Sequence, residues 1–219
     1  MMNRVTADLI LHAYAQGIFP MAETALSPDI YWVDPERRGI IPLNDFHLPR
    51  KLARKIRRQP FEIRIDTAFI KVIEGCAATA AHRSRTETWI NDQIISLYAQ
   101  LFDQGFVHTV ECWQGDRLVG GLYGVSLGRA FCGESMFHTV TDASKVALVY
   151  LVARLKAGSY CLLDTQFITP HLSQFGATEI TRHAYKKRLV RALEGTGDYY
   201  CLSVSSGPET VLQSLTQTS

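Results

Sequence analysis

The sequence predicts an α+β fold in which helices flank a mixed sheet. Three consecutive strand-like runs joined by short glycine-containing turns predict an antiparallel meander, and helical segments stand before and after it. The composition is that of a globular chain, with 219 residues of which 47% are hydrophobic and 20% charged. This length allows one or two domains and a core that needs no disulfide bonds.

A short helix is predicted near the N-terminus. Thr6 suits its N-cap, because a threonine hydroxyl accepts a hydrogen bond from a free N–H of the first turn. The helical pattern continues to Gln16, and Gly17 is a typical terminator before the extended residues 18–20.

The loop-rich segment that follows is predicted to complete a small N-terminal subdomain. Strand-like runs over 30–33 and 39–43 lie among its prolines. We place the boundary between this subdomain, residues 1–60, and a larger domain, residues 61–219. The prolines are Pro20, Pro28, Pro35, Pro42 and Pro49.

A strand and two helices are predicted before the meander. Residues 61–65 alternate as a strand, and Asp66 is expected to cap the helix that follows. A polar loop over 80–87 separates this helix from a second one, 91–103, which ends before Gly105.

The meander consists of three predicted strands, 107–113, 118–126 and 130–137. The turns between them, 114–117 and 127–129, are short enough to make the strands antiparallel neighbours.

Helix and strand alternate after the meander. A helix over 142–156, capped by Asp142 or Ser144 and ended by Gly158, should be buried, because apolar residues run almost all the way round it. A strand over 160–167 follows it.

A helix over 179–193 and a strand over 199–203 complete the predicted order, β-α-α-β-β-β-α-β-α-β. This order matches the GCN5-related acetyltransferase-like architecture. Enzymes of that architecture hold the CoA pyrophosphate in a glycine-rich turn before the helix that follows the meander. Here that turn, residues 138–144, contains no glycine, which disfavours a CoA donor. Four glycines instead lie within or after a strand, where close strand packing is the expected role: Gly120, Gly121, Gly124 and Gly128.

Several classes of protein are excluded by composition. No stretch approaches the roughly 18 apolar residues of a membrane span, and the N-terminus lacks the pattern of a secretory signal, so we expect a cytoplasmic protein. The five cysteines are odd in number and contain no C-x-x-C pair, which favours reduced thiols. The seven histidines are scattered rather than paired at ligand spacing, so we expect no metal site.

The formal net charge of +2 is unevenly distributed. Residues 1–49 hold three arginines against six acids, a net charge of −3. Next come six cations with no acid between them, Arg50, Lys51, Arg54, Lys55, Arg57 and Arg58. On a helix, most of them share a face that suits a phosphate backbone, with a merely solvated surface as an equal alternative. A second basic cluster lies in the predicted C-terminal helix: Arg182, Lys186, Lys187, Arg188 and Arg191.

Polar residues within apolar strands mark a candidate site. Period two places Asp164 and Gln166 on one face of the strand over 160–167, and burying such a pair is costly unless it binds a ligand or ties down a loop. Glu134 is a lone acid in an apolar run of the meander and needs a partner as well. An apolar pocket or simply the core could be built from Trp89, Leu122, Phe131, Met136 and Met21.

An ordered set of short motifs resembles the bacterial leucyl/phenylalanyl-tRNA–protein transferases over roughly residues 8–194. Each motif is weak alone, and the ordered set is specific. The motifs are Gly17-Ile18-Phe19-Pro20; Trp32 with Pro35 and Arg38; Val72-Ile73-Glu74-Gly75-Cys76-Ala77; Thr88-Trp89-Ile90; His108 with Val110-Glu111; Leu118-Val119-Gly120-Gly121-Leu122-Tyr123-Gly124-Val125; Gly133-Glu134-Ser135-Met136-Phe137; Ala143-Ser144-Lys145; and Asp164 with Gln166.

The resemblance implies transfer of leucine or phenylalanine, and less readily methionine, from aminoacyl-tRNA to the N-terminal α-amino group of proteins that begin with arginine or lysine. The added residue would mark such proteins for degradation. The reaction is aminolysis of an activated ester, so no cofactor is expected. The six clustered cations would bind the tRNA, and the protein is expected to be a monomer.

The resemblance also implies roles for the candidate residues. Gln166 would accept a hydrogen bond from the attacking amine, while Asp164 would orient Gln166 and balance the developing positive charge. Glu134 would hold a polar group of the aminoacyl-adenosine. The pocket for the donor side chain would be lined by Trp89, Leu122, Phe131 and Met136. Met21 and Val33 depart from the tryptophans expected at their positions, which implies a softer pocket.

Two rival functions remain open at this point. The first is a CoA-dependent amine acyltransferase with a small-molecule acceptor. The second is a non-catalytic tRNA-binding protein in which Asp164 and Gln166 are purely structural.

Overall fold

A seven-stranded sheet in the order β4-β5-β6-β7-β8-β3-β9 organises the protein. The computed structural model describes residues 5–27, 29–82 and 88–216. Every neighbouring pair of strands is antiparallel except β7 and β8, which are parallel, so the sheet is mixed and the predicted α+β class is confirmed. The strands are β3 (Arg37–Ile41), β4 (Glu62–Ile65), β5 (Val107–Gln114), β6 (Arg117–Leu127), β7 (Ala130–His138), β8 (Leu162–Gln166) and β9 (Thr178–Thr181).

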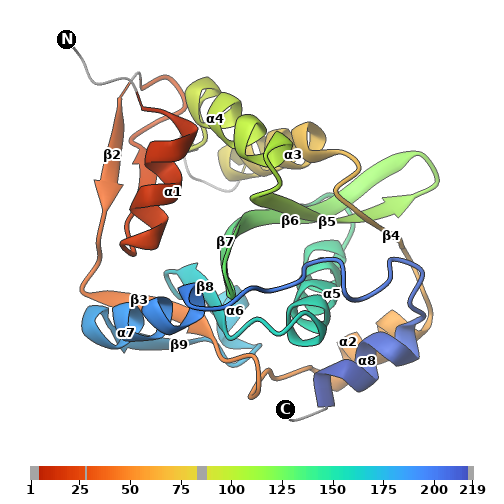
Figure 1. Ribbon diagram of the computed structural model, residues 1–219. Helices are drawn as coiled ribbons and strands as arrows, with labels where there is room; N and C mark the ends of the chain where they lie inside the picture. Colours follow the sequence, from red (N-terminus) through yellow and green to blue (C-terminus); the bar gives the residue numbers. More distant parts are fainter. Residues whose placement is uncertain (1–4, 28, 83–87, 217–219) are drawn as a thin grey trace.

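Helices cover both faces of the sheet (Figure 1). In Figure 1, α3 and α4 lie above strands β5 to β7 and α5 lies below them. A separate two-stranded sheet of β1 (Phe19–Ala22) and β2 (Ile30–Val33) stands beside α1. The helices are α1 (Ala7–Ala15), α2 (Arg50–Arg57), α3 (Phe69–His82), α4 (Asp92–Asp103), α5 (Ala143–Ala157), α6 (Pro170–Ser173), α7 (Arg182–Leu193) and α8 (Pro208–Thr216).

The apolar core is divided by the sheet into two main clusters. On one face, α5 packs with α8 and α2 around Val149, Leu155 and Phe131. On the other face, α1, α3, α4 and β1 enclose Ile73 and Tyr98. The apolar circumference predicted for α5 is explained by this position, because the helix is enclosed on most sides.

The predicted meander is confirmed, and β5, β6 and β7 each extend one or two residues beyond the predicted bounds. The cap predicted at Thr6 is confirmed, and Asn91 caps the helix before the meander. The Thr6 hydroxyl accepts from Leu9 N–H at the start of α1, and the Asn91 side chain accepts from Ile94 N–H at the start of α4. Gly17, with φ +80°, follows the C-cap of α1.

The cap predicted at Asp66 is wrong. Its carboxylate accepts from the N–H of Thr109 and lies 2.8 Å from Nδ1 of His108, so it joins β4 to β5. The N–H groups of Thr67 and Ala68 bind instead to Glu111, a buried residue of β5. An acid distant in sequence therefore replaces the local cap.

Asp142 occupies the N-cap position of α5, but its side chain makes no capping bond. The residue is left-handed, with φ +71°, and its carboxylate pairs with Lys55 and Lys145. The hydroxyl of Ser144, the alternative predicted cap, lies 3.1 Å from Nδ1 of His138.

Other segments also differ from prediction, among them the following four. Residues 80–82 continue α3, and the rest of the predicted loop over 80–87 lies outside the described residues. Thr178–Thr181 is a strand paired with β3, so the C-terminal helix begins only at Arg182. Residues 199–203 do not form a strand. Instead, the ring of Tyr199 stacks on that of His108, with the ring centroids 4.0 Å apart. The predicted strand over 39–43 begins at Arg37 and belongs to the main sheet.

The predicted role of the meander glycines is confirmed at Gly124. A methyl group there would overlap the carbonyl oxygen of Cys132 and the ring of Phe131. We expect Gly124→Ala to lower the free energy of unfolding by about 1–3 kcal/mol, the usual effect of overpacking a core. Urea denaturation measures this change. Gly207→Ala is the control, because a methyl group at that position would have no atom of a non-adjacent residue within 4 Å. Equal losses of unfolding free energy in both variants would contradict the close-packing role of Gly124.

Candidate active site

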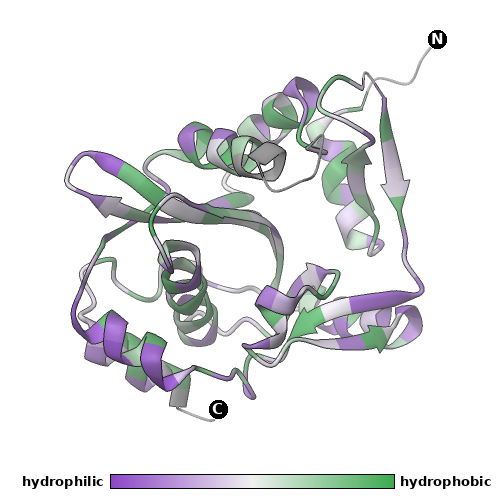
Figure 2. Ribbon diagram, turned by 180° about the vertical axis from the view of Figure 1, so that it is seen from behind, coloured by the Kyte–Doolittle hydropathy of each residue, from purple (hydrophilic) through white to green (hydrophobic). Residues whose placement is uncertain are grey.

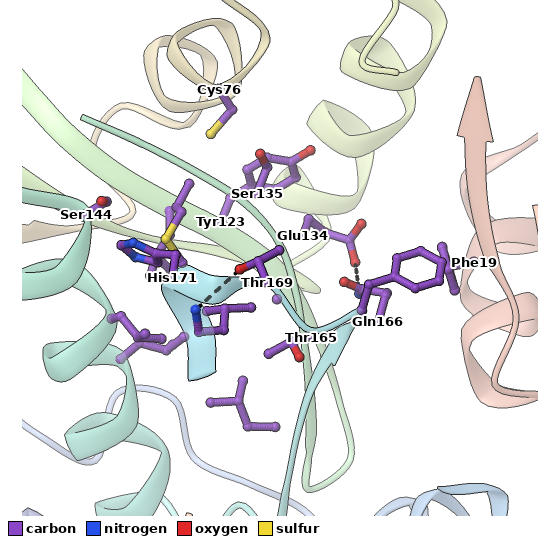
Figure 3. A pocket seen from close by; sticks show the side chains of 18 of the residues that line it. Phe19, Cys76, Tyr123, Glu134, Ser135, Ser144, Thr165, Gln166, Thr169 and His171 are labelled. Atoms are coloured by element: carbon purple, nitrogen blue, oxygen red, sulfur yellow. Dashed lines mark hydrogen bonds between the residues drawn. The ribbon is translucent and has the colours of Figure 1, made fainter. Parts of the chain in front are cut away.

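A pocket of about 500 Å³ opens where β7 and β8 diverge (Figure 3). Their parallel pairing ends at Cys132 and Asp164, whereas β7 continues to His138 in partnership with β6. The gap between the two strands is lined by residues 133–136 and 165–167.

The pocket has an apolar side and a more mixed side. The mixed side brings Phe19 and Met21 of β1 together with Trp89 and Tyr123, which pack with the core around α3 and α4. The apolar side comes from the core around α5 and consists of Leu122, Met136, Leu148, Leu151, Leu163 and Leu172.

Six of the eight residues predicted for catalysis and substrate binding line this pocket. They are Gln166, Glu134, Trp89, Leu122, Met136 and Met21. Phe131 does not line it: its ring is fully buried, with its centroid 5.8 Å from that of Tyr199 in the core. Asp164 does not line it either.

A β-bulge separates Phe131 from the pocket residues of the same strand. Gly124 pairs with Gly133 and Tyr123 with Ser135, so Glu134 has no partner on β6. The extra residue shifts the alternation of β7, which lets Phe131 and Met136 reach the same core despite opposite parity. It also directs the Glu134 carboxylate into the pocket (Figure 3).

Glu134 is partly buried and contacts one group on α4 and one on β8. Its carboxylate accepts hydrogen bonds from the Tyr98 hydroxyl at 3.3 Å and from Nε2 of Gln166 at 3.2 Å. The Tyr98 hydroxyl in turn lies 2.5 Å from that of Tyr14. Burial raises the pKa of Glu134 to about 8, with the charge of Asp164 adding to the shift and the tyrosine hydroxyls opposing it.

Replacing Glu134 by glutamine is expected to stabilise the protein more at pH 8 than at pH 5. An unfolded glutamate ionises at about pH 4.5, whereas folded Glu134 holds its proton up to about pH 8. Between these values the folded state binds more protons, so the contribution of Glu134 to the free energy of unfolding falls as pH rises. Urea titrations of both proteins at the two pH values measure the difference. Glu194→Gln, on the exposed end of α7, is the control, and a pH-independent effect of Glu134→Gln would contradict the expectation.

Gln166 ends β8 in a left-handed conformation, with φ +54°. Its side chain points toward Glu134 and lies beside Phe19, and Ser144 and His171 lie toward the opposite end of the pocket (Figure 3). Because the amide N–H group donates to Glu134, the amide oxygen faces away from that carboxylate and can accept a hydrogen bond from a ligand.

Asp164 is fully buried in an ion pair with Arg38. Arg38 Nε and Nη2 donate to its two oxygens at 2.8 and 2.6 Å, and the Tyr185 hydroxyl donates at 3.0 Å. The carboxylate also accepts from the backbone N–H of Gln166 at 2.9 Å. Asp164 therefore contacts the backbone of Gln166, whereas the side-chain amide of Gln166 donates to Glu134.

Residues missed by sequence reasoning include Arg38, Thr165 and the leucines of α5. Arg38 had a signal in its motif with Trp32 and Pro35, although nothing local links it to Asp164, which lies far away in sequence. Leu148 and Leu151 belong to a helix whose apolar residues run all the way round, so their pattern does not show which of them face a cavity.

The predicted basic segment forms α2, which Figure 2 colours mostly as hydrophilic. The expectation that its cations lack counter-charges is wrong for two of them. Lys55 pairs with Asp142 at 3.0 Å and Arg57 with Glu209 of α8 at 2.9 Å. The remaining four are exposed and form no ion pair with any described residue: Arg50, Lys51, Arg54 and Arg58.

Metal ligands and membrane spans can be assessed for residues 5–27, 29–82 and 88–216. No group of three His, Cys, Asp or Glu side chains within them is placed to hold a metal ion. None of the helices in this part of the chain combines the length and the apolar character that crossing a membrane requires.

Comparison with known proteins identifies the family. Residues 40–190 match the family described as leucyl/phenylalanyl-tRNA protein transferase, and residues 3–36 match its N-terminal domain. Proteins named leucyl/phenylalanyl-tRNA–protein transferase are similar over nearly their whole length. The protein from Caulobacter vibrioides is 55% identical over 98% of both chains, that from Phenylobacterium zucineum 57% over 96% of both, and that from a Ruegeria species 53% over 98% of this chain and 99% of the relative. These matches cover nearly the whole chain, and the chain belongs to the leucyl/phenylalanyl-tRNA–protein transferase family.

Proposed function

We propose that the protein transfers leucine or phenylalanine, and less readily methionine, from aminoacyl-tRNA to the N-terminal α-amino group of proteins that begin with arginine or lysine. The observation that carries this proposal is an apolar chamber directly beside the Glu134–Gln166 pair. Such a chamber suits an aliphatic or aromatic side chain, and the polar pair suits the amine and ester groups that react next to it. The added residue then marks the acceptor protein for degradation.

The donor side chain would enter the leucine-lined part of the pocket. The sheet contributes Leu122, Met136 and Leu163 there, and the helices contribute Leu148, Leu151 and Leu172. Trp89 and Met21, which pack with the opposite core, are left to contact the rest of the aminoacyl-adenosine. A flexible methionine at position 21 would make that contact adaptable.

The reaction needs little more than correct placement. The α-amino nitrogen of the acceptor attacks the ester carbonyl, a C–N bond forms, and the C–O bond to the tRNA ribose breaks. The amine gives up a proton, and the ribose oxygen leaves as a hydroxyl. An α-amino group has a pKa of about 7.7–8.0, so an appreciable fraction is neutral at pH 7 and positioning supplies most of the acceleration.

Gln166 and Glu134 would share the placement of the amine. The amide oxygen of Gln166 accepts a hydrogen bond from the attacking nitrogen, and the bond from its Nε2 to Glu134 fixes the orientation of the amide. The charge of Asp164 is balanced by Arg38, and Glu134 keeps its proton at pH 7, so Glu134 contributes by accepting the hydrogen bond that orients the amide of Gln166. Asp164 acts by holding the backbone of Gln166.

The finer assignments on fold and context are also proposals. The divergence of parallel β7 and β8 above α5 supports the GCN5-related acetyltransferase-like architecture. We also propose the division into residues 1–60 and 61–219. In this division, β3 of the first segment adds a strand to the sheet of the second. We propose that the protein works as a monomer in the cytoplasm, where aminoacyl-tRNA is made.

The first experiment measures transfer of radiolabelled leucine from leucyl-tRNA to two peptides that differ only in an N-terminal arginine or acetyl-arginine. Label on the free arginine peptide alone is expected. Binding of leucyl-tRNA without transfer would instead favour the non-catalytic tRNA-binding protein. Stabilisation by acetyl-CoA without transfer from leucyl-tRNA would favour the CoA-dependent acyltransferase. Gln166→Ala is expected to lower turnover and leave tRNA binding unchanged.

A further inference from the structure

Arg38 occupies the centre of a buried junction between the N-terminal segment and the candidate active site. Its side chain is only 1% exposed, and its guanidinium group lies between two aromatic rings, 4.5 Å from the centroid of Phe19 and 4.4 Å from that of Tyr185. Nη1 donates to the carbonyl oxygen of Gly17 at 3.0 Å, while Nε and Nη2 donate to Asp164. One planar group therefore connects three segments that are distant in sequence.

One connection from Arg38 leads to Gln166. Arg38 fixes both oxygens of Asp164, and one of these oxygens accepts from the backbone N–H of Gln166. Gln166 has φ +54°, a left-handed conformation that is unfavourable for a non-glycine residue and persists only where its surroundings hold it. The same residue directs its amide toward Glu134. Fixing Asp164 therefore fixes the direction of the Gln166 side chain.

The other connection leads to the wall of the pocket. Gly17 lies just before β1, and Phe19 is the first residue of that strand. Residues 19–21 line the pocket. β1 belongs to the two-stranded sheet rather than to the main sheet, so the main-sheet ladder does not determine its distance from β8. Instead, the hydrogen bond from Arg38 to Gly17 and the contact of Arg38 with Phe19 hold β1 at its distance from β8. The edge-to-face pair of Phe19 and Phe167, with centroids 5.8 Å apart, closes the same corner.

We infer that Arg38 is a positioning residue for the transfer reaction, which holds Gln166 and the β1 wall of the pocket in one fixed relation. This inference rests on the proposed function, because it assigns Arg38 an effect through Gln166. The fork geometry of the guanidinium is essential to it. Lysine is a point charge on a flexible stem and cannot bind Asp164 through two parallel bonds while it also reaches Gly17.

The test is a double-mutant cycle with Arg38→Lys and Gln166→Ala. We expect Arg38→Lys to lower kcat for leucine transfer by about 10- to 100-fold, the effect of a small misplacement of a positioning group. The Kd for leucyl-tRNA should change less than about threefold, because α2 is untouched. In the Gln166→Ala background, Arg38→Lys should cause little further loss of kcat. Arg37→Lys, an exposed neighbour paired with Glu179, is the matched control and should keep wild-type turnover.

Each contrary outcome has a distinct meaning. Wild-type kcat in Arg38→Lys, or full additivity with Gln166→Ala, would overturn the positioning role. Wild-type turnover in Gln166→Ala alone would overturn the catalytic role proposed for Gln166. If Arg38→Lys does not fold, Tyr185→Phe decides, because it removes the hydroxyl that donates to Asp164 and accepts from Arg38 and leaves the ion pair intact. Tyr185→Phe should lower kcat in the wild-type background but not in the Gln166→Ala background. An equal loss of kcat in both backgrounds, or no loss in either, would overturn the inference.

Discussion

Replacing Asp164 by alanine is expected to lower the free energy of unfolding by about 3–5 kcal/mol, because it leaves the guanidinium group of Arg38 buried without an anion. The backbone N–H of Gln166 and the Tyr185 hydroxyl lose their acceptor as well. Turnover should fall together with stability, since the Gln166 conformation is no longer held. Urea denaturation and the leucine-transfer assay on the same preparation measure the two effects.

A paired replacement separates stability from catalysis. Arg38→Met combined with Asp164→Leu removes both charges, and apolar replacement of a buried ion pair is often neutral or stabilising. We expect this double variant to recover most of the stability lost in Asp164→Ala while its turnover stays low. An Asp164→Ala protein as stable as the wild type, or a double variant with wild-type turnover, would contradict the roles given to the pair.

The junction around Arg38 also shows where sequence reasoning reached its limit. Alternating residues and turn glycines predicted the meander, because those signals are local and the strands are neighbours along the chain. The pairing of Arg38 with Asp164 joins residues 126 positions apart, and no local pattern encodes such a pair. The lone acid at position 134 did predict a residue that needs partners, and the structure supplies Tyr98 and Gln166.

The errors have local physical causes. Phe131 was predicted to line the pocket, but its ring is buried against that of Tyr199 in the core. Residues 179–181 were predicted to begin a helix, but pairing with β3 holds them extended. Asp66 has the right residue type for a cap, yet a buried acid on β5 binds the same N–H groups. In each case a tertiary contact outweighed a correct local preference.

The second large effect is expected at α2, where four exposed cations form the proposed tRNA contact. Replacing Arg50, Lys51, Arg54 and Arg58 by glutamine should weaken tRNA binding by about 10²- to 10³-fold at 0.15 M salt. The slope of log K against log salt should become shallower by about 3, since each lost phosphate contact removes about 0.7–0.9 from it. Because these side chains lie outside the pocket lining, the maximal turnover at saturating leucyl-tRNA should stay near the wild-type value.

The same helix supplies a matched control for that experiment. Lys55 and Arg57 form ion pairs with Asp142 and Glu209. Replacing both by glutamine should therefore change the salt slope less for each charge removed than the fourfold replacement does. Circular dichroism before each titration tests whether α2 is retained. Equal slope changes per charge would show that binding follows net charge alone. An unchanged slope in the fourfold variant would exclude α2 as the phosphate contact, because a helix that binds the backbone cannot lose four cations without releasing fewer counterions.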